Sequence, residues 1–215
     1  MKKGFTLAEI LITLGIIGII ATLTLPILVQ NYQKHILIKQ YKVFYRDITN
    51  AIELFLQDNN VDDFGETPLG DLTIPFEERK IYFIENFLEK YIVGSSGEFP
   101  KIPIRNLTKT GSIYYITPQF ITEKSVALEF SQGMWNSIFT ITFDINGKKG
   151  PNIIGRDVFR FYIYLNSRIP QGAYMRTDDW DCQNCGDCCR PDLNPHATGW
   201  GCWQRIIQDG WKMNY

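Results

Sequence analysis

Residues 5–29 read FTLAEILITLGIIGIIATLTLPILV and contain one charged side chain, Glu9. An α-helix rises ~1.5 Å per residue, so this stretch would be roughly 37 Å long, more than the ~30 Å hydrocarbon core of a bilayer. Lys2 and Lys3 precede the stretch. The positive-inside rule therefore places the amino terminus in the cytoplasm and the chain after Val29 outside. The sequence predicts a single transmembrane helix.

The composition of the whole chain agrees with a globular protein that carries such a helix. Its 215 residues are 45% hydrophobic and 21% charged, with a formal net charge of −1. This length suits one domain with a tail, and this balance excludes a disordered chain. Because nucleic-acid binders usually have a strong basic excess, the near-neutral charge does not favour that class.

Two simpler explanations of residues 5–29 account for less of the sequence. A cleaved secretory signal has a shorter apolar run and a small-residue cleavage site, and neither fits this stretch. A simple membrane anchor leaves Glu9 unexplained, because a carboxylate inside a bilayer is costly and is usually functional. The carboxylate therefore points to a more specific role for the helix.

Residues 2–9, KKGFTLAE, resemble the class III signal of type IV prepilins and type II secretion pseudopilins. The resemblance implies that a membrane-bound prepilin peptidase cuts between Gly4 and Phe5. It also implies that the same enzyme methylates the new amino group of Phe5. Residues 1–4 would then be a leader peptide, and the membrane would be the bacterial inner membrane.

The resemblance extends to three further positions of the apolar stretch, Glu9, Gly18 and Pro26. It implies that the Glu9 carboxylate pairs with the Phe5 amine of a neighbouring subunit and sets the axial register of a filament. Gly18 and Pro26 lie where many family members have a glycine and a proline. Because glycine and proline both weaken helices, we expect a kink or local unwinding between them, with a role in filament packing.

The helical pattern continues beyond the apolar stretch, over residues 30–57. Apolar residues recur there at spacings of three and four: Leu37, Tyr41, Phe44, Ile48, Ala51 and Phe55. This spacing predicts an amphipathic continuation of the same helix, with one face available to cover a domain.

Residues 58–179 predict a globular head. We expect a loop at 58–75, a helix at 77–91, a turn-rich stretch at 93–110, and strands at 112–117, 126–130, 139–145 and 159–165. The alternation within these strands predicts an antiparallel sheet with one face packed on a core, and the helix stripe is the obvious cover. The predicted fold class is α+β, pilin-like: a long N-terminal helix on a small antiparallel sheet, with a Cys-rich C-terminal tail.

The loop between the last two predicted strands is a candidate calcium site. Four of its side chains offer the hard oxygens that Ca²⁺ prefers: Asp144, Asn146, Asn152 and Asp157. The resemblance adds that some pseudopilins hold calcium in a loop of the sheet region. The spacing departs from the EF-hand, however, and Lys148 and Lys149 oppose a cation. We favour a structural loop, in which residues 146–147 turn and Asp157 bonds backbone amides, and expect no other cofactor.

Residues 180–215 concentrate the cysteines, Cys182, Cys185, Cys188, Cys189 and Cys202. Their C-x-x-C spacing would suggest zinc in a cytosolic protein, with His196 as a further ligand. Outside the membrane disulfides persist, so two disulfides and one free thiol are favoured. We expect Cys188 and Cys189 not to bond each other and one of them to reach Cys202; the full pairing stays open.

The same segment holds four tryptophans, Trp180, Trp200, Trp203 and Trp211. We expect them to form a small core of their own, pinned by the disulfides. The alternative is an exposed aromatic patch for a partner.

These features predict a non-enzymatic filament subunit of a type IV pilus or a type II secretion pseudopilus. Its expected partners are prepilin peptidase, other pilin or pseudopilin subunits, an inner-membrane assembly platform and membrane lipid, but not nucleic acid. One alternative is a minor pilin that acts as a tip adhesin or DNA receptor. A membrane-tethered hydrolase is another, although the chain has only His35 and His196. The sequence does not separate a pilus from a secretion or competence apparatus.

Overall fold

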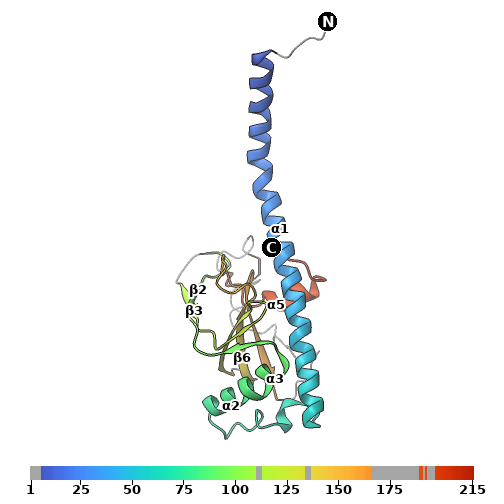
Figure 1. Ribbon diagram of the computed structural model, residues 1–215, viewed down its shortest axis with the longest axis vertical. Helices are drawn as coiled ribbons and strands as arrows, with labels where there is room; N and C mark the ends of the chain where they lie inside the picture. The colour runs from blue at the N-terminus through green and yellow to red at the C-terminus, as the bar shows by residue number, and fades with distance from the viewer. Residues whose placement is uncertain (1–5, 110–112, 134–136, 166–188, 191, 193–196) are drawn as a thin grey trace. The chain divides into compact units, whose positions relative to one another are not determined.

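The computed structural model describes residues 6–109, 113–133, 137–165, 189–190, 192 and 197–215. Contacts within the chain define two compact units, Met1–Ile36 and Leu37–Tyr215. The five-stranded sheet, the shorter helices and the described part of the C-terminal region belong to the second unit (Figure 1).

The first element, α1, is a helix of 53 residues, Leu7–Asn59 (Figure 1). It ends two residues beyond the expected position and is helical without a break through Gly18 and Pro26. The local unwinding expected between these two residues is therefore not present. Threonine hydroxyls in this part donate to carbonyls four residues back, as Thr22 does to Gly18 at 2.7 Å. Such bonds satisfy a hydroxyl without water.

In the second unit, α1 has one buried face. The buried residues are Leu37, Ile38, Tyr41, Phe44, Ile48, Thr49, Ala51, Ile52, Phe55 and Leu56. The Tyr41 ring stacks 5.1 Å from the Phe159 ring, and the Phe44 ring lies 4.7 Å from that of Phe143, measured between centroids. The predicted stripe is confirmed, and it covers the sheet as expected.

The main sheet is antiparallel, with strand order β1-β4-β5-β6-β7. Its strands are β1 (Gly94–Ser96), β4 (Phe120–Thr122), β5 (Ala127–Gln132), β6 (Ser137–Asp144) and β7 (Val158–Tyr164). A separate antiparallel pair consists of β2 (Ile102–Ile104) and β3 (Tyr114–Ile116). The register pairs Phe143 of β6 with Leu128 on one side and Phe159 on the other.

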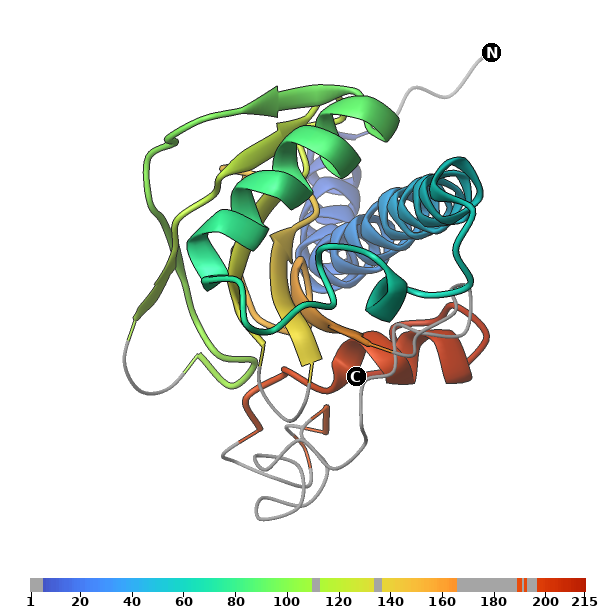
Figure 2. The same ribbon diagram turned by 90° about the horizontal axis from the view of Figure 1, so that it is seen from below.

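The predicted helix at 77–91 is present as three joined pieces. They are α2 (Phe76–Phe83), a π-helical turn η2 (Ile84–Leu88) and α3 (Glu89–Tyr91), preceded by a short 3₁₀ helix η1 (Phe64–Glu66). The Phe83 ring stacks on that of Phe139 at 5.0 Å. Since Phe139 and Phe143 share one face of β6, α2 and α1 cover the same side of the sheet (Figure 2).

The expectation of a sheet with one packed face is wrong for β6, because all eight of its residues are buried. On the other side of the sheet lies a second hydrophobic cluster, made of Ile102, Ile104, Ile116, Ala127, Ile154 and Val158. The pair β2–β3 supplies three of these residues. Two strands of the structure, β1 and β2, lie in the stretch 93–110 that was expected to be rich in turns.

The expectation that the tryptophans form a core of their own is also wrong. Trp203 is the second residue of α5 (Cys202–Gln208). Its side chain is 1% exposed and belongs to the main core, the hydrophobic cluster between α1 and the sheet. Its ring centroid lies 4.3 Å from Tyr41, 5.0 Å from Phe143 and 5.5 Å from Phe161. Trp211 packs against the same core and Trp200 against the second cluster. Trp180 lies outside the described residues.

Because Trp203 joins α5 to both α1 and the sheet, replacing it should destabilise the whole head. We predict that Trp203→Ala lowers the free energy of unfolding by about 3–5 kcal/mol, the usual range for a buried Trp. Urea denaturation of the detergent-solubilised chain, followed by circular dichroism, measures this. Val93→Ala, at a side chain that is 70% exposed, is the control and should change little. Equal stability of both variants would contradict the assignment of α5 to the core.

Candidate functional site

The start of α1 is organised by Thr6 and Glu9. The Thr6 amide and hydroxyl each donate to Glu9 Oε2 at 2.8 Å, and the Glu9 amide donates to Thr6 Oγ1 at 3.3 Å. This reciprocal pattern is a capping box, which satisfies amide groups that have no partner inside the helix. The T-x-x-E spacing of residues 6–9 could have revealed the role of Thr6, which the sequence analysis missed.

The capping box holds the Glu9 carboxylate at the amino end of the helix, where the helix dipole favours a negative charge. Gly4 and Phe5, the expected cleavage and methylation residues, lie outside the described residues. In the chain, Phe5 immediately precedes Thr6. An amino group created at Phe5 would therefore belong to the residue directly before Thr6, whose amide and hydroxyl bind Glu9.

The remainder of this unit presents apolar side chains. Exposed residues include Leu7, Leu11, Ile12, Ile16, Ile19, Leu23 and Leu28. Among the described residues, α1 is the helix that is long and apolar enough to cross a membrane, by length and composition. A helix that is apolar on all sides needs an apolar environment. His35, also in this unit, is exposed, and His196 lies outside the described residues.

The loop between β6 and β7 brings the four predicted oxygen-bearing side chains together. The Asn146 amide donates to Asp144 Oδ1 at 3.1 Å, and the Asn146 side-chain amide is 3.5 Å from Asp157 Oδ2. The Asn152 amide donates to Asp157 Oδ2 at 2.8 Å and the Ile153 amide to Asp157 Oδ1 at 2.6 Å. The predicted bonds from Asp157 to backbone amides are therefore confirmed.

Three oxygens of this cluster are buried and accept no hydrogen bond from the described residues. They are Asp144 Oδ2, Asn146 Oδ1 and Asn152 Oδ1. A buried oxygen without a partner costs free energy, so native proteins usually supply one. The described residues leave these three oxygens unsatisfied, and the chemistry of the oxygens fits a hard cation.

The charges in the loop point the same way. Burial, reinforced by the nearby Asp157 carboxylate, raises the pKa of Asp144 to about 8. Burial also raises the pKa of Asp157, against the backbone amides of Ile153 and Asn152 and the positive charge of Arg156. Both aspartates are 0% exposed. Two buried carboxyl groups therefore lie close to each other, and a bound cation would stabilise their charged forms.

The two lysines expected to oppose a cation are on the surface of the loop. Lys148 and Lys149 are exposed, so their charges are solvated. Among the described residues, no group of three or more His, Cys, Asp or Glu is placed to hold a metal ion. A cation at this loop would therefore depend on amide oxygens together with the two carboxylates, a mixture typical of calcium rather than zinc.

The C-terminal region contains a disulfide between Cys189 and Cys202. This bond confirms that one of the vicinal cysteines reaches Cys202. It is also incompatible with these two thiols serving as zinc ligands. Cys182, Cys185 and Cys188 lie outside the described residues, so the second expected disulfide stays a prediction.

Taken together, the fold is α+β and pilin-like: a long helix with an apolar N-terminal part, packed through its second part on a small antiparallel sheet. Residues 1–25 match the family described as the prokaryotic N-terminal methylation motif, the signature of type IV pilins and pseudopilins. Comparison with curated proteins and with solved structures gave no match.

The motif and the fold define the class of protein. The chain carries a prepilin-type amino terminus, which implies a structural subunit that prepilin peptidase processes and that assembles with other pilin subunits. The motif and the apolar helix also fit a single-pass protein anchored in the inner membrane.

Proposed function

We propose that this chain is a subunit of a type IV pilus or a type II secretion-like filament, polymerised through α1. The observation that supports this most directly is the methylation motif at the start of a helix whose apolar side chains the rest of the described chain leaves uncovered. In the precursor, the amino terminus would lie in the cytoplasm and the head outside the inner membrane.

The apolar part of α1 restricts where this helix can reside. In water the exposed side chains would be costly, whereas a bilayer or a bundle of identical helices provides an apolar environment. Assembly would therefore exchange lipid contacts for contacts with other copies. The inner-membrane assembly platform that would move the subunit between these environments is part of the proposal.

Glu9 would direct this exchange. In the single chain its carboxylate is bound by Thr6. After cleavage at Gly4, the cationic amine of Phe5 on a neighbouring subunit would offer a stronger, oppositely charged partner. Charges in a low-dielectric environment are tolerated mainly as pairs, so this contact would fix the axial position of each new subunit.

Neutralising Glu9 should block assembly but not processing. We predict that Glu9→Gln inserts into the membrane and is cleaved, since the substitution keeps the size of the side chain and an acceptor for Thr6. Its yield of sheared filaments should fall at least tenfold, because the charge pair is lost. Quantitative immunoblotting of cleaved subunit in membrane and filament fractions measures both.

Glu53→Gln is the matched control, at an exposed carboxylate elsewhere on α1, and should assemble normally. Normal entry of the Glu9→Gln chain into filaments would contradict the proposed pairing. That result would instead suit a minor subunit recruited through its head, such as a tip adhesin.

We also propose that the β6–β7 loop binds Ca²⁺ through Asp144, Asn146, Asn152 and Asp157. The three oxygens without a partner among the described residues and the buried pair of carboxyl groups support this. Calcium takes six to eight oxygen ligands, so backbone carbonyls or water would complete the shell. Bound calcium would supply charge compensation and crosslink the two ends of the loop.

Calcium should therefore stabilise the head. At a concentration ~100 times the dissociation constant, a ligand of the native state adds about 2.7 kcal/mol to the free energy of unfolding. We predict that Asn146→Ala weakens binding roughly tenfold, or about 1.4 kcal/mol, and destabilises the calcium-free protein by less than that. The reason is that Asn146 Oδ1 has no partner among the described residues, and the side-chain amide makes only a long contact of 3.5 Å with Asp157 Oδ2.

Calorimetric titration and thermal unfolding, each with calcium and with EGTA, measure these effects. Asn86→Ala is the control, because this residue is exposed and belongs to η2, far from the β6–β7 loop along the chain. Absence of any calcium-dependent stabilisation in the unmodified protein would contradict the proposed site.

A further inference from the structure

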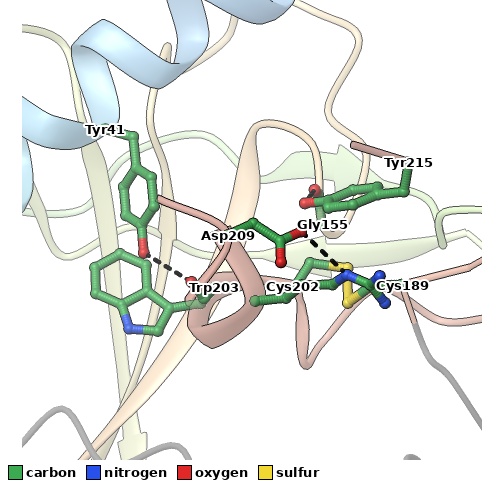
Figure 3. Close-up of a disulfide and its surroundings, with 8 residues drawn as sticks. Tyr41, Gly155, Cys189, Cys202, Trp203, Asp209 and Tyr215 are labelled. Atoms are coloured by element: carbon green, nitrogen blue, oxygen red, sulfur yellow. Dashed lines mark hydrogen bonds and ion pairs between the residues drawn. A yellow bond between two sulfur atoms is a disulfide. The ribbon is translucent and has the colours of Figure 1, made fainter. Parts of the chain in front are cut away.

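The backbone of the β6–β7 loop binds Asp157 and also contacts the C-terminal segment, defined as residues 197–215. The Tyr215 hydroxyl donates to the Gly155 carbonyl at 2.6 Å, and the Tyr215 side chain lies near the disulfide (Figure 3). Gly155 is three residues from Asn152, whose amide is bound by Asp157. One short stretch of backbone thus connects the proposed cation ligands with the C-terminal segment.

The two segments are also packed without intervening space. A Cβ atom on Gly155 would lie 2.8 Å from Cys202 Sγ and 2.9 Å from the Gly199 Cα, closer than real Cβ atoms approach. A Cβ on Gly199 would lie 2.2 Å from the Ile154 carbonyl oxygen. Only glycine fits at these two positions, so the backbone of the loop forms the surface on which the segment around Cys202 rests.

A third segment links both partners. The Arg105 amide donates to the Asn152 carbonyl at 3.0 Å, and the Ile154 amide donates to the Arg105 carbonyl at 2.8 Å. Two residues further along, the Leu107 amide donates to the Thr198 carbonyl at 3.0 Å. Movement of the loop at Asn152 would therefore strain bonds that hold the C-terminal segment from two sides.

The disulfide is shielded by this packing. Cys202 is 0% exposed and Cys189 is 3% exposed. A reductant reaches these sulfur atoms only when the surrounding structure opens, so the rate of reduction reports how firmly the segment is docked.

We propose that cation binding in the β6–β7 loop controls the docking of the C-terminal segment and thereby the accessibility of the Cys189–Cys202 disulfide. This inference rests on the proposed calcium site. Asn152, whose amide donates to Asp157, lies at one end of the Asn152–Gly155 stretch, and the docking contact of Gly155 with Tyr215 lies at the other. A cation that orders the stretch therefore stabilises both. With a cation bound, the segment would stay docked and the disulfide would stay buried. Without the cation, the segment would open more often and expose the disulfide to a reductant.

The test is the rate at which Cys202 becomes labelled by iodoacetamide in the presence of dithiothreitol, followed by peptide mass spectrometry. The full detergent-solubilised chain is compared in calcium and in EGTA, with calcium binding measured separately by calorimetry. We expect calcium to slow labelling of Cys202 at least tenfold. Asn146→Ala should need a roughly tenfold higher calcium concentration than the unmodified chain to reach the same protection.

Tyr215→Phe isolates the docking contact, because it removes the bond to Gly155 and leaves every proposed ligand in place. We expect this variant to bind calcium and yet to show severalfold less protection of Cys202. Tyr115→Phe, at an exposed side chain of β3, is the control and should retain full protection. Calcium binding without any change in Cys202 labelling would overturn the coupling and leave the calcium site standing. No calcium binding at all would overturn both.

Discussion

The structure depends on one constraint: α1 must be compatible with two environments along a single helix. Its first part is apolar on all sides, which only lipid or other apolar helices can satisfy, whereas its second part is apolar on one face. That face carries the head, since Tyr41 stacks on Phe159 of the sheet and donates to the Trp203 carbonyl of α5. The exception in the apolar part is Glu9, and the proposed function follows from its need for a partner.

Much of this fold could be predicted because it follows from short-range patterns of apolar residues in the sequence. The spacing of Tyr41, Phe44 and Ile48 gave the buried face of α1, and alternation gave β5, β6 and β7. Three strands were missed, β1, β2 and β4, and each is three residues long, too short to show an alternation. β1 contains only Gly and Ser, and β2 contains Pro103, which is tolerated because β2 pairs with a single neighbour. The position of Trp203 depends on contact with Tyr41, 162 residues away, and no local pattern encodes it.

The candidate sites show a similar division. The four oxygen-bearing side chains of the β6–β7 loop could be chosen by residue type. The sequence left two alternatives for them, a calcium site and a purely structural loop. The structure contains the hydrogen bonds that backbone amides donate to Asp157 and also three buried oxygens that have no partner within the described part of the chain. A structural loop and a cation site are therefore compatible here. The bond between Cys189 and Cys202 depends on how α5 packs, which the spacing of cysteines alone does not encode.

The central proposal is that this chain is a prepilin whose mature form begins at Phe5. Mass spectrometry of the intact protein, from membranes of cells with and without prepilin peptidase, tests it most directly. We predict loss of Met1–Gly4 and addition of one methyl group to the Phe5 amine, only when the peptidase is present. An intact Met1 in both membranes would contradict the account.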